Sequence, residues 1–475
     1  MLKFIHCADL HLNRLFKNVS ISNSSVLDAL TASTQRAWNQ IIDTAIQQQV
    51  DFVAICGDIF DSESPDIATQ LKFLESLKRL NEHHIQAFII TGNHDPLSSW
   101  SKSLVFPENT TIFDSKIAEC IKIFDTQKQH IANVLGFSFK NKQQPTSVVQ
   151  KFYNYIEKNN LVERNVPNIG LLHCEIVGVN NSAELTTNIY APTTISELNN
   201  KKFIDYWALG HVHQRQEVLN EDYKQNSLIL YPGIMQGRSI NDVGDKGCWL
   251  VSCDNEKFKN NSALDAWDVQ FLPTSSLNYY SLHIEIQQNH LDNEFELKDY
   301  EKNLEFICDF LLNFICKKIQ KIVENRSQAS IAQTYILRCI IEGRVDKNWC
   351  EFINDFGNEI LERINEEFVN EKVMGIECYL EKIVLNTKAI YNYENLKNSS
   401  PFFTELNNFF YDMNNELFKL EGDEKVRYFL GNEKLLNMNI NLKKRALELL
   451  DDEDVKQIID LGLSDSFNYT LDEED

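Results

Sequence analysis

The chain has 475 residues, of which 43% are hydrophobic and 11% aromatic, a composition that excludes an intrinsically disordered protein and predicts two or three folded domains. It contains no apolar run of about 18 or more residues, so a membrane-spanning segment is not expected. Its 11 cysteines are scattered without a C-x-x-C pair, and its first residues lack a signal-peptide layout. These features predict reduced thiols and a cytoplasmic location.

The net charge of −23 is concentrated toward the C-terminal end. Residues 276–475 contain 39 acidic and 22 basic side chains, whereas residues 1–275 contain 30 and 24. This charge repels a phosphate-rich ligand at long range, so any binding of nucleic acid has to depend on local basic residues, bound metal or a partner. The alternative for the acidic end, LDDEDVKQIIDLGLSDSFNYTLDEED, is a solvated segment that only aids solubility.

Residues 1–275 alternate short apolar runs with longer amphipathic runs. We expect strands at LKFIHCA, DFVAICG and IQAFIITG, and helices over residues 26–49 and at DIATQLKFLESLKRLNEH. Four later runs predict further strands: NIGLLHC, FIDYWALG, SLILYPG and GCWLVSC. Strands that first alternate with helices and then follow one another closely predict a layered α/β core that gains antiparallel strands later.

From residue 276 the pattern changes. NYYSLHIEI, TYILRCIIEGRV and IECYLEKIVL predict three strands, and residues 293–322 and 347–369 predict two helices, a combination typical of a small α+β domain. From residue 386 the chain is acidic and has a helical pattern. We therefore predict domains at residues 1–275, 276–385 and 386–475.

Polar side chains follow five of the apolar runs. FIHCADLHL, VAICGDIFD, FIITGNHD, IGLLHCE and YWALGHVH each end with Asp, Asn or His, and open α/β sheets place their sites at the carboxyl ends of strands. In the last run the two His residues stand at i and i+2, so on an extended segment they point the same way. The candidate metal ligands are Asp9, His11, Asp58, Asn93, His173, His211 and His213.

Each of these fragments is a weak indication on its own. A single D-x-H or G-N-H is most often ordinary loop chemistry, and a single His is most often a hydrogen-bonded structural residue. Strand ends do not require Gly-Asp or Gly-Asn-His-Asp, however, and five such endings together favour a metal site. Nitrogen and oxygen ligands without cysteine indicate Mn²⁺, Fe or Zn²⁺ and argue against a closed thiolate zinc site.

The order D-x-H, G-D, G-N-H-[DE], H, G-H-x-H resembles that of the calcineurin-like metallophosphoesterases, and it covers residues 4–213. GDIFD lacks the Asp-Arg-Gly that follows in the serine/threonine phosphatases. The stretches YAPTTISELNNKKFIDYWALGHVHQRQEVL and YPGIMQGRSINDVGDKGCWLV resemble the bacterial DNA repair exonucleases of the SbcD/YhaO type. Two loop positions depart from that pattern, Ile234 after Pro-Gly and the Leu12-Asn13 that follows His11, and both leave the substrate preference open.

The resemblance implies an α/β fold, an α+β layered β-sandwich core, followed by a small α+β cap domain and a helical C-terminal region. It also implies two divalent ions, with Mn²⁺ as the working ion and Asp58 between them. One ion would take Asp9, His11, Asp58 and His213, and the other Asp58, Asn93, His173 and His211. Two such ions neutralise the charge of a phosphodiester and activate water for in-line attack.

Further residues beside these ligands are candidates for catalysis. His94 follows a ligand without being one in the family pattern, and it can donate a proton to the leaving oxygen or hold the phosphate. Asp95 is expected to orient it. We interpret Asp61 as structural. Arg215 and Arg238 are candidate phosphate contacts, with surface or ion-pair roles as the alternative.

The leading hypothesis is a metal-dependent DNA nuclease in DNA repair or in defence against foreign DNA, an exonuclease for which additional endonuclease activity is left open. The resemblance implies DNA and an SMC-like coiled-coil ATPase of the SbcC type as partners, the ATPase docked on helices after the cap, and a homodimer is left open. PFFTELNNFFYDMNNELFKL has the spacing of such a helix face, with an internal core face as the alternative. The other hypotheses are a phosphatase or phosphodiesterase of small nucleotides and a non-catalytic scaffold.

Overall fold

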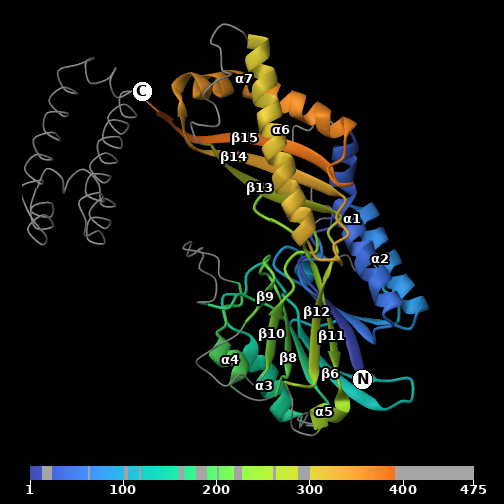
Figure 1. Cartoon of the computed structure of the whole chain (residues 1–475). Helices are drawn as coiled ribbons and strands as arrows, with labels where there is room; N and C mark the ends of the chain where they lie inside the picture. Colours follow the sequence, from blue (N-terminus) through green and yellow to red (C-terminus); the bar gives the residue numbers. More distant parts are fainter. Residues whose placement is uncertain are drawn as a thin grey trace, which may run out of the picture. The chain divides into compact units, whose positions relative to one another are not determined.

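The computed structural model describes most of residues 1–390 (Figure 1). The described ranges are 1–12, 24–61, 65–100, 105–116, 119–159, 165–177, 190–200, 203–218, 227–259, 264–286 and 300–390. They form two compact units. The first consists of Met1–Ser281, Cys316–Arg338 and Asn365–Glu381, and the second of Leu282–Ile315, Cys339–Ile364 and the described residues from Lys382 to Ile390.

The first unit contains a six-stranded sheet with the strand order β12-β11-β1-β2-β3-β4. Its strands are β1 (Leu2–Cys7), β2 (Phe52–Cys56), β3 (Gln86–Ile90), β4 (Thr110–Ile112), β11 (Gly247–Cys253) and β12 (Trp267–Pro273). Strands β1 to β4 are parallel, whereas β11 runs antiparallel to both β1 and β12. The antiparallel strands that the sequence predicts for the later part of the core are therefore present.

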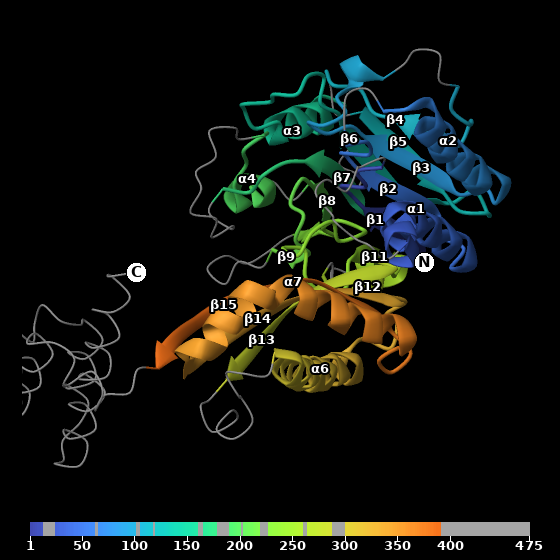
Figure 2. The same ribbon diagram turned by 90° about the horizontal axis from the view of Figure 1, so that it is seen from above.

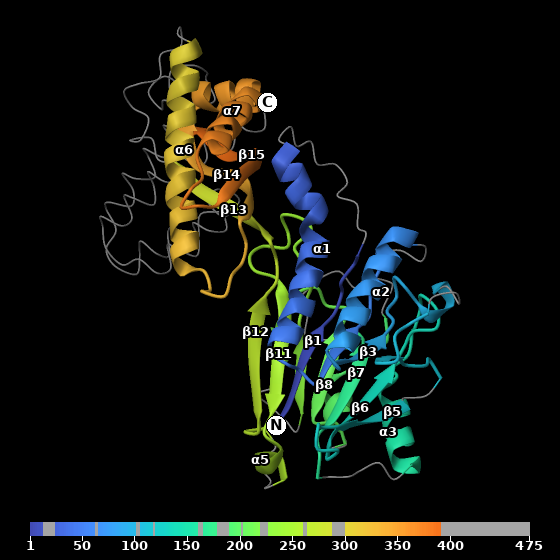
Figure 3. The ribbon, with the colours of Figure 1, turned by 90° about the vertical axis from the view of Figure 1, so that its right-hand side faces the viewer.

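Helices α1 (Ser24–Gln47) and α2 (Ile67–Glu82) cover one face of this sheet (Figure 3). Apolar side chains recur at helical spacing in both, so each helix has a buried stripe that packs on the strands. Trp38 of α1 and Phe73 of α2 lie in one core cluster with Ile55 of β2. Asp66 begins α2 by accepting the Thr69 N–H at 2.8 Å, the usual role of a capping Asp.

The second sheet has the strand order β5-β6-β7-β8-β10-β9. Its strands are β5 (Glu119–Phe124), β6 (His130–Phe137), β7 (Asn168–His173), β8 (Tyr206–Gly210), β9 (Gln216–Glu217) and β10 (Leu228–Tyr231). Helices α3 (Val149–Lys158) and α4 (Ile195–Asn199) pack on it, with Phe152 and Leu198 in the same core cluster as Trp207 of β8.

The two sheets face each other across a buried core. Side chains alternate along a strand, so each strand gives one set to its helices and the other to the opposite sheet. The Phe4 ring stacks on Phe52 in its own sheet at 4.6 Å and meets Tyr206 of the other sheet edge-on at 5.2 Å. The result is a helix–sheet–sheet–helix sandwich. The predicted α/β fold class is confirmed.

A third sheet is formed by β13 (Leu277–Ile286), β14 (Thr334–Asp346) and β15 (Glu377–Ile390), in that order. Helices α6 (Tyr300–Asn325) and α7 (Lys347–Asn370) connect its strands, as the pattern after residue 276 predicts. The boundary between the two units passes through these elements, and the predicted division at residues 275 and 385 stays a prediction. The remaining short helices are η1 (Leu97–Ser99) and α5 (Asn255–Lys259).

The predicted helical region from residue 386 needs one correction. Residues 386–390 are the end of strand β15, which continues past the expected boundary. The rest of this region, including PFFTELNNFFYDMNNELFKL, lies outside the described residues. Within the part of the chain that the structure describes, no helix is both long and apolar enough to cross a membrane.

Candidate metal centre

The seven predicted ligands lie at the carboxyl ends of strands from both sheets of the sandwich. β1, β2 and β3 are parallel neighbours in one sheet, and β7 and β8 are parallel neighbours in the other (Figure 2). The carboxyl ends of parallel neighbours meet at one edge of a sheet, so the residues that follow them come together. These residues are Asp9 and His11 after β1, Asp58 after β2, Asn93 after β3, His173 at the end of β7, and His211 and His213 after β8.

Left-handed backbone angles shape the loops that carry these side chains. The φ angle is +51° at Asp9, +44° at His11 and +48° at Asp58, values that residues other than glycine adopt rarely. Backbone hydrogen bonds hold the first two loops together, because Asp9 N–H donates to the Gly57 carbonyl at 3.1 Å and His11 N–H to the Asp58 carbonyl at 3.0 Å. Backbone strain of this kind is typical of functional sites.

We name the first group of ligands site A, which consists of Asp9, His11 and His213. One ligand atom of each lies within 4.8 Å of the others. The two histidine Nε2 atoms are 3.2 Å apart, and their rings meet edge to face. The other nitrogen of His11, Nδ1, is 3.0 Å from Asp61 Oδ1, so this carboxylate favours a proton on Nδ1 and leaves the Nε2 lone pair for a metal.

We name the second group site B, which consists of Asp58, Asn93, His173 and His211. His173 Nε2 lies 3.1 Å from Asn93 Oδ1 and 3.5 Å from Asp58 Oδ2. Its Nδ1–H donates to the Cys56 carbonyl at 3.0 Å, a backbone partner that fixes the direction of the ring. The His211 ring meets that of His173 edge-on at 5.2 Å.

Asp58 and Asp9 connect the two sites. One carboxylate oxygen of each lies within 4.8 Å of the other and of His173. One ligand atom of Asp58 also lies within 4.8 Å of one each from His11, in site A, and His94. The His211 N–H donates to both Asp9 oxygens at 3.0 and 3.1 Å. Asp58 is buried and has candidate ligands of both sites beside it. A carboxylate in such a position would be able to bind two ions at once.

The buried charges perturb one another strongly. Burial and the charge of Asp58 raise the pKa of Asp9 to about 7, against the effect of His173. Burial alone would raise the pKa of Asp58, but His173, His11 and His94 outweigh it and hold that pKa well below its usual range. Burial would lower the pKa of His173, yet Asp58 and Asp9 raise it to about 9. The carboxylates of the centre therefore strongly stabilise positive charge placed among them.

The other histidines of the centre are poor bases in the protein alone. Burial and the charge of His173 lower the pKa of His211 to about 3. Burial and the charge of Arg238 lower the pKa of His213 to about 2. Burial also lowers the pKa of His11, although Asp61 opposes this. Neutral imidazoles are the form that binds metal ions.

His94 lies beside both sites. Its ring meets that of His11 edge-on at 4.9 Å, and its backbone N–H donates to Asp58 Oδ1 at 2.9 Å. Its Nδ1 lies 3.3 Å from the carbonyl oxygen of Asp61. A proton on Nδ1 is stabilised there, which leaves Nε2 to exchange a proton with a substrate. Asp61, which the sequence suggests is structural, here contacts a ligand through its side chain and His94 through its backbone.

The carboxylate of Asp95 holds the loops rather than the His94 ring. Its Oδ1 accepts the Gly92 N–H at 3.2 Å, and its Oδ2 accepts the N–H groups of Ile59 and Phe60 at 3.0 and 3.3 Å. These bonds tie the loop after β3 to the loop after β2. The sequence suggests a different role for Asp95, which is to orient the His94 ring. In the structure the His94 ring contacts the Asp61 carbonyl instead.

The two candidate phosphate contacts have different surroundings. Arg238 Nη2 lies 2.7 Å from His213 Nδ1, Nη1 lies 4.0 Å from Asp61 Oδ1, and the side chain is only 9% exposed. The Arg215 guanidinium lies over the Phe271 ring, 4.0 Å from its centroid, in a cation–π contact. The structure thus brings Arg238 to the metal centre, whereas Arg215 packs on strand β12.

The role of Asp61 beside the site was missed by sequence reasoning. Its spacing of three residues from Asp58 in GDIFD is the signal that could have linked it to the site.

A buried histidine joins the two sheets near the same strand ends. His6 Nε2–H donates to the Leu209 carbonyl at 3.0 Å, and its Nδ1 accepts the Tyr206 hydroxyl at 3.0 Å. Burial lowers the pKa of His6 to about 3, so the ring is neutral. This pair of bonds fixes β1, which leads to Asp9, against β8, which leads to His211.

The donor set fits two divalent ions. It contains carboxylate, amide and imidazole groups and no thiolate, the mixture that suits Mn²⁺, Fe or Zn²⁺. His11 and His173 each have a partner on Nδ1, as metal-binding histidines usually do, and their Nε2 atoms face the other ligands. The geometry is that of a centre for phosphoester chemistry.

Comparison with known families decides the identity of this region. Residues 2–215 match the family described as calcineurin-like phosphoesterase. They form a calcineurin-like phosphoesterase domain. The resemblance that the strand-end motifs indicate is thereby confirmed.

Three relatives show how far the similarity to this domain extends. The chain is 33% identical over 255 residues to "Uncharacterized metallophosphoesterase YhaO" of Bacillus subtilis, which covers 54% of this chain and 58% of that protein. It is 25% identical over 390 residues to "DNA double-strand break repair protein Mre11" of Methanococcus maripaludis, covering 79% and 92%. It is 23% identical over 353 residues to one subunit of the nuclease SbcCD of Escherichia coli, covering 68% and 82%. The chain thus spans little more than half the length of the first of these.

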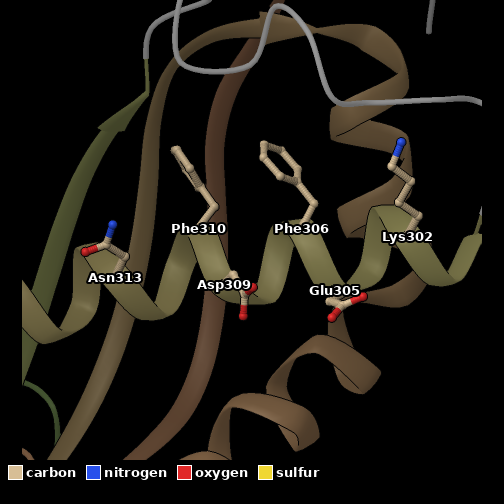
Figure 4. A pocket seen from close by; sticks show the side chains of 6 residues that line it. All are labelled: Lys302, Glu305, Phe306, Asp309, Phe310 and Asn313. Atoms are coloured by element: carbon tan, nitrogen blue, oxygen red, sulfur yellow. The ribbon is translucent and has the colours of Figure 1, made fainter.

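A hollow of a different kind lies outside the phosphoesterase domain, in the second unit. It has a volume of about 410 Å³ and is lined by one face of α6. The rings of Phe306 and Phe310 point to the same side of the helix, with Lys302 one turn before them (Figure 4). The two aromatic side chains follow helical spacing, and no catalytic arrangement is evident among these residues.

Proposed function

We propose that the chain is a metal-dependent DNA nuclease that hydrolyses phosphodiester bonds, as an exonuclease and an endonuclease, in DNA repair or in defence against foreign DNA. The observation that carries this proposal is the position of Asp58 between site A and site B, at the ends of strands from both sheets. Two ions held there, with Mn²⁺ as the working ion, supply neutralisation of the phosphate charge and acidification of water.

The residues of the chain divide the remaining work. The ligands of both sites hold their positions through loop hydrogen bonds, so the phosphorus can be placed in line between the attacking water and the leaving oxygen. Hydrolysis forms a bond from phosphorus to the water oxygen and breaks the bond to the sugar oxygen. The leaving oxygen needs a proton, and His94 is the group beside both sites that can supply it.

The extent of the similarity favours DNA over a small nucleotide. The match to the relative named as a DNA double-strand break repair protein runs for 390 residues and so extends well beyond the 2–215 domain. The match to the relative named as part of a nuclease covers 82% of that protein. A small-nucleotide enzyme does not need the additional residues that these matches include.

The charge of the chain favours a partner that supplies positive surface. The net charge is −23, and DNA is repelled by a protein of that charge unless cations or a basic partner intervene. The name of the Escherichia coli relative describes it as one component of an assembly. We propose an SMC-like coiled-coil ATPase as the partner of this chain.

Two substrates separate the candidate functions. The full chain, purified from its native cells with any bound ATPase, is incubated with MnCl₂ and either linear double-stranded DNA or bis-p-nitrophenyl phosphate. We expect both to be cleaved and EDTA to abolish both reactions. Cleavage of only the small ester would favour a phosphodiesterase of small nucleotides, which the acidic charge supports. Cleavage of neither by protein that has bound Mn²⁺ would favour a scaffold.

A further inference from the structure

Two charged side chains lie behind the histidine pair of site A. Asp61 Oδ1 is 3.0 Å from His11 Nδ1, and Arg238 Nη2 is 2.7 Å from His213 Nδ1. Arg238 Nη1 is also 4.0 Å from Asp61 Oδ1. On the inner side, the Nε2 atoms of the two rings are 3.2 Å apart. The two rings therefore lie between Arg238 on one side and Asp61 on the other.

The chemistry of the two outer groups determines where each ring carries its proton. A guanidinium only donates hydrogen bonds and an ionised carboxylate only accepts them. His213 must therefore accept at Nδ1 and, as a neutral ring, carry its proton on Nε2. Asp61 Oδ1 lies 3.0 Å from His11 Nδ1, and its negative charge stabilises a proton on that nitrogen, which leaves the lone pair on His11 Nε2. The His213 Nε2–H then points to His11 Nε2.

This arrangement prepares one ligand for a metal ion and blocks the other. A metal binds the lone pair of a ring nitrogen, and the nitrogen of each ring that faces site A is Nε2. His11 presents that lone pair. His213 presents a proton, and the ring can expose its Nε2 lone pair only if the proton moves to Nδ1. Arg238 occupies Nδ1, and its guanidinium cannot accept a proton. Arg238 therefore has to withdraw before His213 can bind metal.

His173 of site B has an acceptor behind its ring instead of a donor. His173 donates from Nδ1 to the Cys56 carbonyl, an acceptor that is compatible with metal at Nε2. The position of Arg238 is also a buried one, since its side chain is 9% exposed. Its contact with His213 is thus part of the packed centre and does not arise from a freely moving surface arginine.

We propose that Arg238 is a positioning residue that competes with the metal ion for His213, so that filling site A displaces the guanidinium from His213 Nδ1. Arg238 weakens metal binding at site A and leaves site B unchanged, and the displaced guanidinium becomes available to other acceptors, such as Asp61, whose Oδ1 is 4.0 Å from Nη1. This inference rests on the two-ion centre of the proposed function but not on DNA as the substrate.

Metal binding in the absence of substrate tests the inference. Calorimetry of the full chain with MnCl₂ is compared with Arg238→Met, which removes both the donor and the charge and keeps an unbranched side chain. We expect one of the two Mn²⁺ affinities to increase by about tenfold or more and the other to stay the same. Arg79→Met is the matched control, because Arg79 also pairs with a carboxylate, Asp43 at 2.6 Å, but on the outer helices. Its Mn²⁺ affinities should equal those of the unchanged protein.

A second measurement separates loss of the donor from loss of a positive charge. The chain is labelled with ¹⁵N-histidine, and His213→Gln identifies the His213 signals. As Zn²⁺, a diamagnetic probe, is added to the unchanged protein, the His213 ring should change from the Nε2–H to the Nδ1–H form. Unchanged Mn²⁺ affinities in Arg238→Met, or a His213 ring that is already in the Nδ1–H form without metal, would overturn the inference. Absence of any metal binding would overturn the two-ion centre as well, and binding without DNA cleavage would overturn only the nuclease.

Discussion

Sites A and B offer similar ligands but are supported in different ways. The outer nitrogen of His173 in site B contacts a backbone carbonyl at the end of β2. The outer nitrogens of His11 and His213 in site A contact the charged side chains of Asp61 and Arg238. A backbone partner is fixed by the strands themselves, whereas side-chain partners can move or be replaced. The fold therefore orients His173 of site B, whereas the loops after β2 and β10 orient the two histidines of site A.

The largest effect is expected from Asp58→Asn, which tests what the two sites share. The amide removes a negative charge from between them, so we expect both Mn²⁺ affinities to fall and hydrolysis of bis-p-nitrophenyl phosphate to decrease by roughly a thousandfold or more, or about 4 kcal/mol. Asp51→Asn, at the other end of β2, is the control. If Asp58→Asn lost only one ion, the carboxylate would belong to a single site and the two sites would be independent.

His94→Gln is expected to affect neither site but to reduce the chemical step. The variant lacks the group that can protonate the leaving oxygen, and general acid catalysis contributes about 10²–10⁴-fold. We expect kcat for phosphodiester hydrolysis to decrease by a factor within that range, while calorimetry still shows two bound Mn²⁺ ions. A substrate whose leaving group needs no proton should be less affected. Loss of an ion in this variant would make His94 a ligand, contrary to our assignment.

Gly57→Ala sharpens the comparison, because it affects the support of site B. The φ angle of Gly57 is +86°, and an added Cβ would lie 2.3 Å from His173 Nδ1. We expect a loss of about 1–3 kcal/mol in the free energy of unfolding and a weaker Mn²⁺ affinity at one site. Gly244→Ala is a matched control, since its φ is +75° and nothing lies within 4 Å of the added Cβ. Equal effects of the two substitutions would show that only the backbone angle matters.

The smallest effect at neutral pH is expected from His6, which supports both sites. The folded pKa of His6 is lowered to about 3 from 6.5, so the unfolded chain binds a proton first as the pH falls. The contribution of His6 to the free energy of unfolding is therefore fully present above pH 6.5. It decreases toward pH 3 by roughly 1.4 kcal/mol per pH unit. His6→Gln should flatten that part of the urea-unfolding profile, whereas His83→Gln on the surface should not. An unchanged profile in His6→Gln would mean that His6 is not the buried neutral group.

The sequence predicts the elements that carry the ligands because each is a long apolar run with a polar ending. The strands within DFVAICG and YWALG are buried at every residue, so burial and strand character coincide. Strands β5 and β6 are not predicted from the sequence. In β5 only Ile123 is buried, so that edge strand lacks a continuous apolar signal. Its place in the sheet depends on its pairing with β6, which residue types alone do not reveal.

The candidate ligands could be named for the same reason, because residue type at a strand end indicates them, but their partners in the structure could not. The contacts of Asp61 and Arg238 depend on which way loop side chains turn, and these two residues are 177 positions apart in the sequence. Asp95 illustrates the same limit, because its proximity to His94 in the sequence suggests a contact, while its carboxylate binds three backbone N–H groups.

The left-handed angles at Asp9, His11, Asp58 and His211 have a consequence for the speed of metal capture. The conformational cost of these angles is met when the chain folds, and the loop hydrogen bonds keep them in place afterwards. An arriving ion thus encounters a cage whose main chain already has its working shape. Closure of the loops therefore does not limit the rate at which an ion enters.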